Sequence, residues 1–233
     1  MLKTYLLNDQ FLLFGAVDIP ATTENSMKLF KSLGDKGFFP QIVREINSEN
    51  GAVLNRLGFT NTADMEIVFN TDRVQISKAG PAEGRSAISL EEVSRGVCEI
   101  LQSEFNLSMS RVVLISEKLV EDSNKDRFES SHARFINAAD VEGMFEWQYR
   151  TTRVIQRDKA TFLGVQEVSR AHGTMVMNGN SKNFDAIRMR IEMGTNVLES
   201  NVPYTPLESF GLYNKLLSEV ESSFKVLDGI YNG

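Results

Sequence analysis

The feature that most constrains the fold of this chain is a series of short apolar runs that are joined by turns. In the clearest pair, DMEIVFNTDRVQIS, two alternating runs flank the tripeptide NTD at 70–72, which is typical of a β-hairpin. In a second pair, the dipeptide NG at 178–179 marks a tight turn between two runs of strand composition. Strands that follow each other through turns pair antiparallel, so the sequence predicts an α+β fold with a largely antiparallel sheet.

Three to four helices complete the predicted fold. A helix near 22–33 has regularly spaced apolar residues on one face. Ser89 and Glu92 have the spacing of a capping box at the start of a second helix, and a short helix is expected near 124–136. Residues 38–52 fit neither the helical nor the strand pattern clearly and stay unassigned.

The C-terminal helix has the strongest start signal in the chain. Thr205 is the predicted N-cap, Pro206 takes the first helical position, and Glu208 completes a capping box. Apolar residues then recur at alternating steps of three and four: Phe210, Tyr213, Leu217, Val220, Phe224, Leu227 and Tyr231. This spacing is also that of a coiled-coil seam, through which the chain would form a homo-oligomer. Leu216 widens the stripe, so a long helix packed on the chain's own sheet is the favoured interpretation.

The length of 233 residues is enough for one large domain. No linker rich in Gly, Ser or Pro divides the chain, so we expect a single α+β domain over residues 1–233. The alternative is two intimately packed halves, about 1–108 and 109–233. It is suggested by two well-capped helices that each follow a pair of strands.

The stretch FEWQYRTTRVIQRD, residues 145–158, contains the only tryptophan and three arginines. As a helix it would align the arginines in a basic ridge suited to nucleic acid, whereas a strand separates them. Aromatic and β-branched residues dominate the stretch, which favours a strand. The candidates for a ligand or interface contact are therefore Trp147, Tyr149, Arg153 and Arg157. Arg153, on the aromatic face, is either an arginine at the rim of the sheet or a contact to an anion, and both interpretations stay open.

Few residues of this chain form patterns that enzymes use, so we expect a protein without catalytic activity. It has no glycine-rich phosphate loop and no nucleophile elbow. The pair Glu129 and His132 has di-metal spacing but lacks the second pair that such sites need. Cys98 lies among apolar residues of a predicted helix, as buried thiols do, and the acidic clusters at 121–129 and 140–142 are interpreted as surface. We predict no catalytic residue, no cofactor and no metal.

Charge and cysteine content narrow the functional classes further. A net charge of −6 disfavours binding to nucleic acid or to an anionic membrane. No apolar run reaches the length of a membrane span, and a single cysteine suits the reducing cytoplasm. The favoured hypothesis is a non-catalytic cytoplasmic interaction protein that binds another protein, as a subunit or adaptor of a larger bacterial or phage-related assembly. The alternative is a binding module for a small anionic or nucleotide-like ligand.

Overall fold

The computed structural model describes residues 2–46, 50–62, 64–80, 88–136, 146–157, 160–177, 180–196 and 203–233. Their strands form one nine-stranded sheet in the order β2-β3-β4-β5-β1-β6-β9-β8-β7, and every neighbouring pair is antiparallel. The strands are β1 (Leu2–Gly15), β2 (Phe38–Ile46), β3 (Val53–Asn61), β4 (Met65–Phe69), β5 (Arg73–Ala79), β6 (Met109–Asp122), β7 (Gln148–Arg157), β8 (Ala160–Met177) and β9 (Asn180–Thr195). The predicted antiparallel α+β fold is confirmed.

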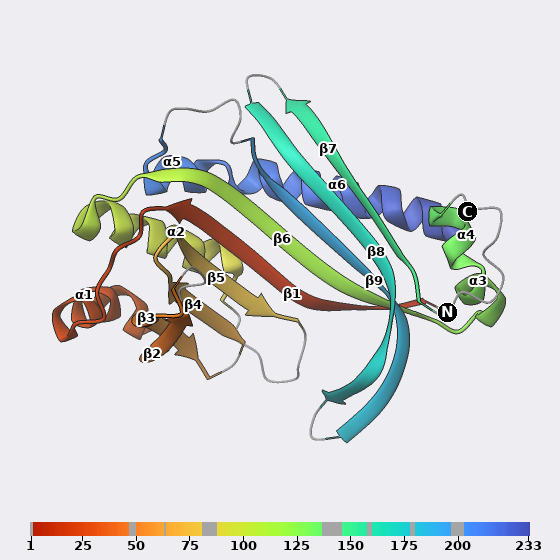
Figure 1. Cartoon of the computed structure of the whole chain (residues 1–233), viewed down its shortest axis with the longest axis horizontal. Coiled ribbons are helices and arrows are strands. Elements are labelled where there is room, and N and C mark those ends of the chain that lie inside the picture. Colours follow the sequence, from red (N-terminus) through yellow and green to blue (C-terminus); the bar gives the residue numbers. More distant parts are fainter. Residues whose placement is uncertain are drawn as a thin grey trace.

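Strand β1 holds the two parts of the sheet together. It pairs with β5 on one side and with β6 on the other, so that β2 to β5 and β6 to β9 belong to the same sheet (Figure 1). The β1–β6 ladder is long and runs from Leu2 opposite Asp122 to Gly15 opposite Met109. The predicted hairpin at 64–77 is present as β4 and β5, whereas the predicted turn at 178–179 lies outside the described residues.

Four helical regions occur where the sequence predicts helices. Their α-helices are α1 (Thr23–Leu33), α2 (Leu90–Ile100), α3 (Lys125–Glu129), α4 (Ser131–Phe135), α5 (Pro206–Gly211) and α6 (Tyr213–Asn232). The C-terminal region is one helix in the prediction but two in the structure, because the helical hydrogen-bond pattern is interrupted at Leu212, whose amide donates to the Ser209 carbonyl. The capping box at its start is complete: the Glu208 amide donates to the Thr205 hydroxyl, and the Thr205 amide donates to the Glu208 carboxylate.

The apolar stripe of α6 is used within the chain. This helix lies across β9 and β6 (Figure 1). Its buried side chains are Tyr213, Leu216, Val220, Ser223, Leu227 and Tyr231. Except for Ser223, they belong to the same hydrophobic core as Ile191 and Met193 of β9. Packing on the chain's own sheet is therefore confirmed, and the position of Leu216, fully buried beside the stripe, explains why the apolar face is wider than a coiled-coil seam.

The other end of the sheet is covered less completely. Helix α2 packs against β5 and β1, and α1 packs against β2. Leu29 and Leu33 of α1 are fully buried, and so are Leu57 and Phe59 of β3. Beyond this contact the β2–β3 hairpin extends to Ile46 and Val53, where its side chains are exposed.

Candidate functional site

The predicted strand in the stretch 145–158 is β7, the edge strand at one end of the sheet. It pairs with β8 without a register shift, from Gln148 opposite Ser169 to Arg157 opposite Ala160. Because side chains alternate between faces along a strand, Arg150 and Arg153 point to opposite faces. The strand assignment is confirmed from Gln148 onwards; Phe145 lies outside the described residues.

Trp147 and Tyr149 meet at the start of β7, where they contact helix α4. The Trp147 ring stacks on Phe135 with ring centroids 5.9 Å apart, and the Tyr149 ring lies 5.8 Å from the same residue. Trp147 is 7% exposed and Tyr149 is partly buried. Their aromatic surface is thus packed largely against this chain's own helix.

Arg153 and Arg157 lie further along the same strand. Arg157 lies ten positions after Trp147, which corresponds to roughly 33 Å of extended chain. Arg157 donates from Nε to Glu219 Oε1 of α6 at 2.6 Å and from Nη2 to Oε2 at 3.2 Å. Arg153 is exposed on the face that carries the aromatic residues. The structure therefore brings Trp147 and Tyr149 together but places Arg157 at a separate point.

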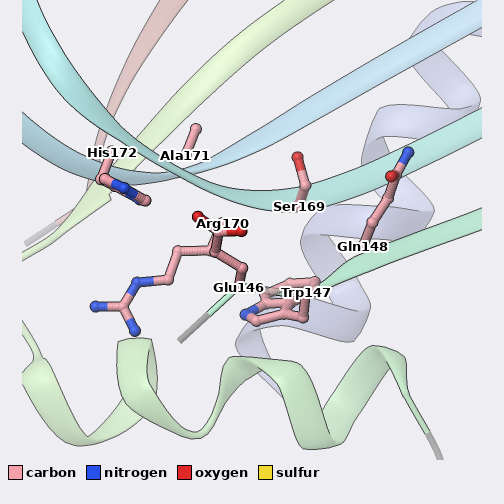
Figure 2. A pocket seen from close by; sticks show the side chains of 7 residues that line it. All are labelled: Glu146, Trp147, Gln148, Ser169, Arg170, Ala171 and His172. Carbon is pink, nitrogen blue, oxygen red and sulfur yellow. The ribbon is translucent and has the colours of Figure 1, made fainter. Parts of the chain in front are cut away.

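A pocket of about 440 Å³ lies beside Trp147 (Figure 2). Its lining residues are Glu146, Trp147, Gln148, Ser169, Arg170, Ala171 and His172. Figure 2 shows the Arg170 side chain extending towards the short helices below the sheet. Sequence reasoning did not single out Arg170, since it is one charged residue in a long strand-like run.

The Arg170 guanidinium is already bound by carboxylates. It donates from Nε to Asp185 Oδ1 at 2.9 Å and from Nη1 to Glu129 Oε2 at 3.2 Å, and it lies 4.9 Å from the centre of the Phe128 ring. The hydrogen bonds to Asp185 raise the pKa of Arg170 above its ordinary value. A carboxylate or phosphate entering the pocket would have to compete with these two acids for the same donors.

Glu129 and His132 do not share a continuous helix. Glu129 ends α3, His132 lies in α4, and the Glu129 carboxylate pairs with Arg170. In the described ranges no three Asp, Glu, His or Cys side chains are grouped so that they could hold a metal ion. Cys98 is fully buried, and this burial raises the pKa of its thiol to about 12.

The acidic cluster at 121–129 includes one structural carboxylate. Asp122 accepts a hydrogen bond from Arg127 Nη2 at 2.9 Å and one from the Tyr231 hydroxyl at 2.9 Å. The hydrogen bonds from Arg127 are the main reason why the pKa of Asp122 is lowered to about 2. Asp122 thus joins β6 to α3 and α6. The second acidic cluster, at 140–142, lies outside the described residues.

A surface that the sequence did not reveal lies at the opposite end of the sheet, on the β2–β3 hairpin and α1. Six large hydrophobic side chains are exposed there; we call them the hairpin surface, and they are Met27, Phe39, Ile42, Ile46, Val53 and Leu54. The remaining exposed large hydrophobics of the described residues are dispersed: Leu6, Val154, Leu207 and Val226. Single exposed hydrophobics are ordinary on protein surfaces, whereas a local group of them indicates an interaction site.

Apart from Met27 of α1, the residues of the hairpin surface lie on both faces of β2 and β3. Ile42 lies opposite Leu57 and Ile46 lies opposite Val53 on one face. Side chains an odd number of positions apart in one strand point to opposite faces. The other face therefore carries Phe39, which is three positions from Ile42 in β2, and Leu54, which follows Val53 in β3. A groove of about 330 Å³ runs between α1 and the first face, and Met27, Pro40, Ile42 and Leu57 are among its lining residues.

The sequence of β2, FFPQIVREI, explains why periodicity did not reveal it. A strand with one buried face alternates apolar and polar residues, but β2 has apolar residues at both odd and even positions. The proline at its third position, Pro40, further weakens a strand prediction. The signal that could have been used is this combination of strand composition and proline, which is typical of an edge strand.

Comparison with models of known protein families and with characterised proteins finds no match to this chain. Among the helices of the described residues, none is both long enough and apolar enough to span a lipid bilayer.

Proposed function

We propose that this chain is a non-catalytic interaction protein that binds another protein through the hairpin surface, as a subunit or adaptor of a larger cytoplasmic assembly. The observation that carries the proposal is the concentration of exposed apolar side chains at one end of the sheet. Ile46 is 70% exposed, Ile42 is 59% exposed and Val53 is 58% exposed. The unpaired, buried Cys98 is compatible with a reducing compartment.

Contact with a partner would remove this apolar surface from water. Fully burying one exposed Ile, Val or Phe side chain contributes about 1.5–3 kcal/mol. Several such residues within one hairpin can therefore form the apolar centre of an interface, with Arg44 and Glu45 as polar neighbours in the same strand. An uncovered apolar edge strand is also an aggregation hazard, so coverage by a partner would serve the chain itself.

The alternative, a module for a small anionic or nucleotide-like ligand, stays a prediction with Arg153 as its anion contact. The carboxylates around Arg157 and Arg170 make those two guanidiniums poor choices for that role. We propose no binding to duplex nucleic acid, because the net charge is −6 and β7 does not align its arginines on one face.

A site-specific photo-crosslinker tests the interaction. Benzoylphenylalanine would replace Ile46 in the full chain, expressed in the cells that normally produce it, and irradiation should join the chain to one recurrent partner. The matched control carries the same group at Val154, which is 60% exposed on β7, the other edge strand. Equal crosslinking at both positions, or none at Ile46, would contradict the proposal.

A further inference from the structure

The outer edge of β2 is open to pairing. β2 is the last strand of the sheet, and among the described residues only β3 pairs with it. An edge strand presents a row of backbone N–H and C=O groups that another chain can use as a template. The β2–β3 register is regular along its whole length, from Phe38 opposite Asn61 to Ile46 opposite Val53.

Pro40 indicates which backbone groups point outwards. Proline has no N–H, and in edge strands it occupies positions whose N–H side faces solvent. In an antiparallel ladder the N–H and C=O of one residue point to the same side, and this side alternates along the strand. The backbone groups of Pro40 therefore point outwards together with those of Ile42, Arg44 and Ile46. Each of the latter three can donate its N–H and accept at its C=O, whereas Pro40 can only accept.

The apolar residues on both faces of the hairpin favour a strand as the occupant of this edge. A docked helix would cover only one face of the sheet, whereas an added strand places alternate side chains next to both. One face offers Ile42, Ile46 and Val53, and the other offers Phe39 and Leu54. The groove beside Ile42 can additionally receive an apolar side chain from the added strand.

Arg44 specifies the charge of that strand. It is exposed on the same face as Ile42 and Ile46 and lies between them. Within the described ranges, no carboxylate forms an ion pair with Arg44. A second copy of this chain, paired so that Ile42 lies opposite Ile46, would place Arg44 directly opposite Arg44, and like charges in that position are destabilising.

We propose that the hairpin surface binds an extended segment of a partner protein, which pairs with β2 as an additional antiparallel strand. This segment has an acidic residue opposite Arg44 and apolar residues two positions before and after it. The inference rests on the proposed function, since it describes how the partner is held on the same surface.

A displayed library of random peptides of about nine residues, near the upper end of the usual range of strand lengths, supplies the probe. Selection on the immobilised full-length chain should enrich the pattern apolar-x-acidic-x-apolar. Selection on Arg44→Glu should enrich a basic residue at the central position instead. A lack of enrichment, or a pattern that does not respond to the charge reversal, would overturn strand addition.

Backbone pairing is tested with the best selected peptide and two substitutions of one residue. Arg44→Ala removes the charge but keeps the outward N–H, whereas Arg44→Pro removes both. Because a lost backbone hydrogen bond also leaves the peptide carbonyl without its donor, Arg44→Pro should bind about tenfold more weakly than Arg44→Ala. Circular dichroism of both variants would verify that the sheet is retained.

The outcomes separate the two proposals. If Ile46→Asp abolishes binding while Arg44→Pro and Arg44→Ala bind equally, the surface is an interface but strand addition is wrong. If Ile46→Asp leaves peptide binding unchanged, and benzoylphenylalanine at position 46 joins the chain to no recurrent partner, the proposed function fails as well. If sedimentation shows a dimer that Ile46→Asp dissociates, the occupant is a second copy, and the acidic partner segment is wrong.

Discussion

Ile46 lies directly opposite Val53 in the β2–β3 ladder, and both side chains are more than half exposed. The same type of pair in the next part of the sheet, Ile67 opposite Ile76, is fully buried. The difference arises because the helices cover the strands near β1 and leave the end of the hairpin uncovered. An apolar pair that contributes nothing to the core is the feature on which the proposed interface depends.

Polar substitution of this pair should leave the fold intact. We expect Ile46→Thr with Val53→Thr to change the free energy of unfolding by less than about 1 kcal/mol, since exposed positions contribute little to stability. The matched variant Ile67→Thr should lower it by about 2 kcal/mol or more, because it places a hydroxyl in the core. Urea denaturation measures both. A loss in the double variant as large as that of Ile67→Thr would show that the pair is structural.

The stacking of Trp147 on Phe135 should be visible in fluorescence, because the chain has one tryptophan. We expect Phe135→Ala to shift the emission to longer wavelength, to increase quenching by acrylamide and to cost about 3–5 kcal/mol of stability. The control Phe39→Ala removes a ring that is 55% exposed and should change neither spectrum nor stability noticeably. An unchanged spectrum in Phe135→Ala would contradict the observed packing.

Asp122 should make the stability depend on pH in the acid range. Its pKa is lowered to about 2 in the folded chain, so its contribution is fully present above the unfolded pKa near 3.9 and is lost as the pH falls towards 2. We expect Asp122→Asn to lower the free energy of unfolding by about 1–2 kcal/mol at pH 7 and to flatten its decrease between about pH 4 and pH 2. Unfolding titrations at several pH values measure this. If the variant retains the wild-type acid dependence, other carboxylates are responsible.

Removal of the C-terminal helices should abolish the native fold. Leu216, Val220 and Leu227 are buried in the main core, and truncation before Thr205 would expose Ile191 and Met193 of the sheet as well. This loss exceeds the total stability of a typical domain, about 5–15 kcal/mol, so we expect insoluble or molten protein. Calorimetry and circular dichroism are the measurements. A truncated chain that still unfolds cooperatively would mean that α6 is an accessory element.

Much of the fold follows from local patterns in the sequence. The capping residues Ser89 and Thr205 start their helices as predicted, because a cap depends only on residues within one turn. The hairpin of β4 and β5 and the strand β7 follow from alternation and composition, which are equally local. The break at Leu212 was not predicted, since the pattern of apolar residues continues through it.

The candidate ligand or interface residues were all chosen from one predicted strand. The sequence did not show which residues from other elements would contact them. Phe135, which stacks on Trp147, comes from α4, and Glu219, which binds Arg157, comes from α6. Both partners are separated from β7 by loops or strands, and a single sequence does not specify which distant residues meet. Trp147 and Arg153 as ligand contacts therefore remain predictions.

By itself, the sequence determined the types of most elements, the starts of the capped helices and the apolar stripe of the C-terminal helix, because these depend on residues within a few positions of one another. It left β2 and β3 without an assignment. Only the tertiary structure decided which apolar residues would be buried. β2 has apolar residues at both even and odd positions, as a strand buried on both faces does. However, β2 is the last strand of the sheet, and α1 covers only part of one face. Exposure depends on which elements lie beside a strand, and strand order is fixed by contacts between residues far apart in the chain. The hairpin surface with its open edge became visible only in the assembled sheet for that reason.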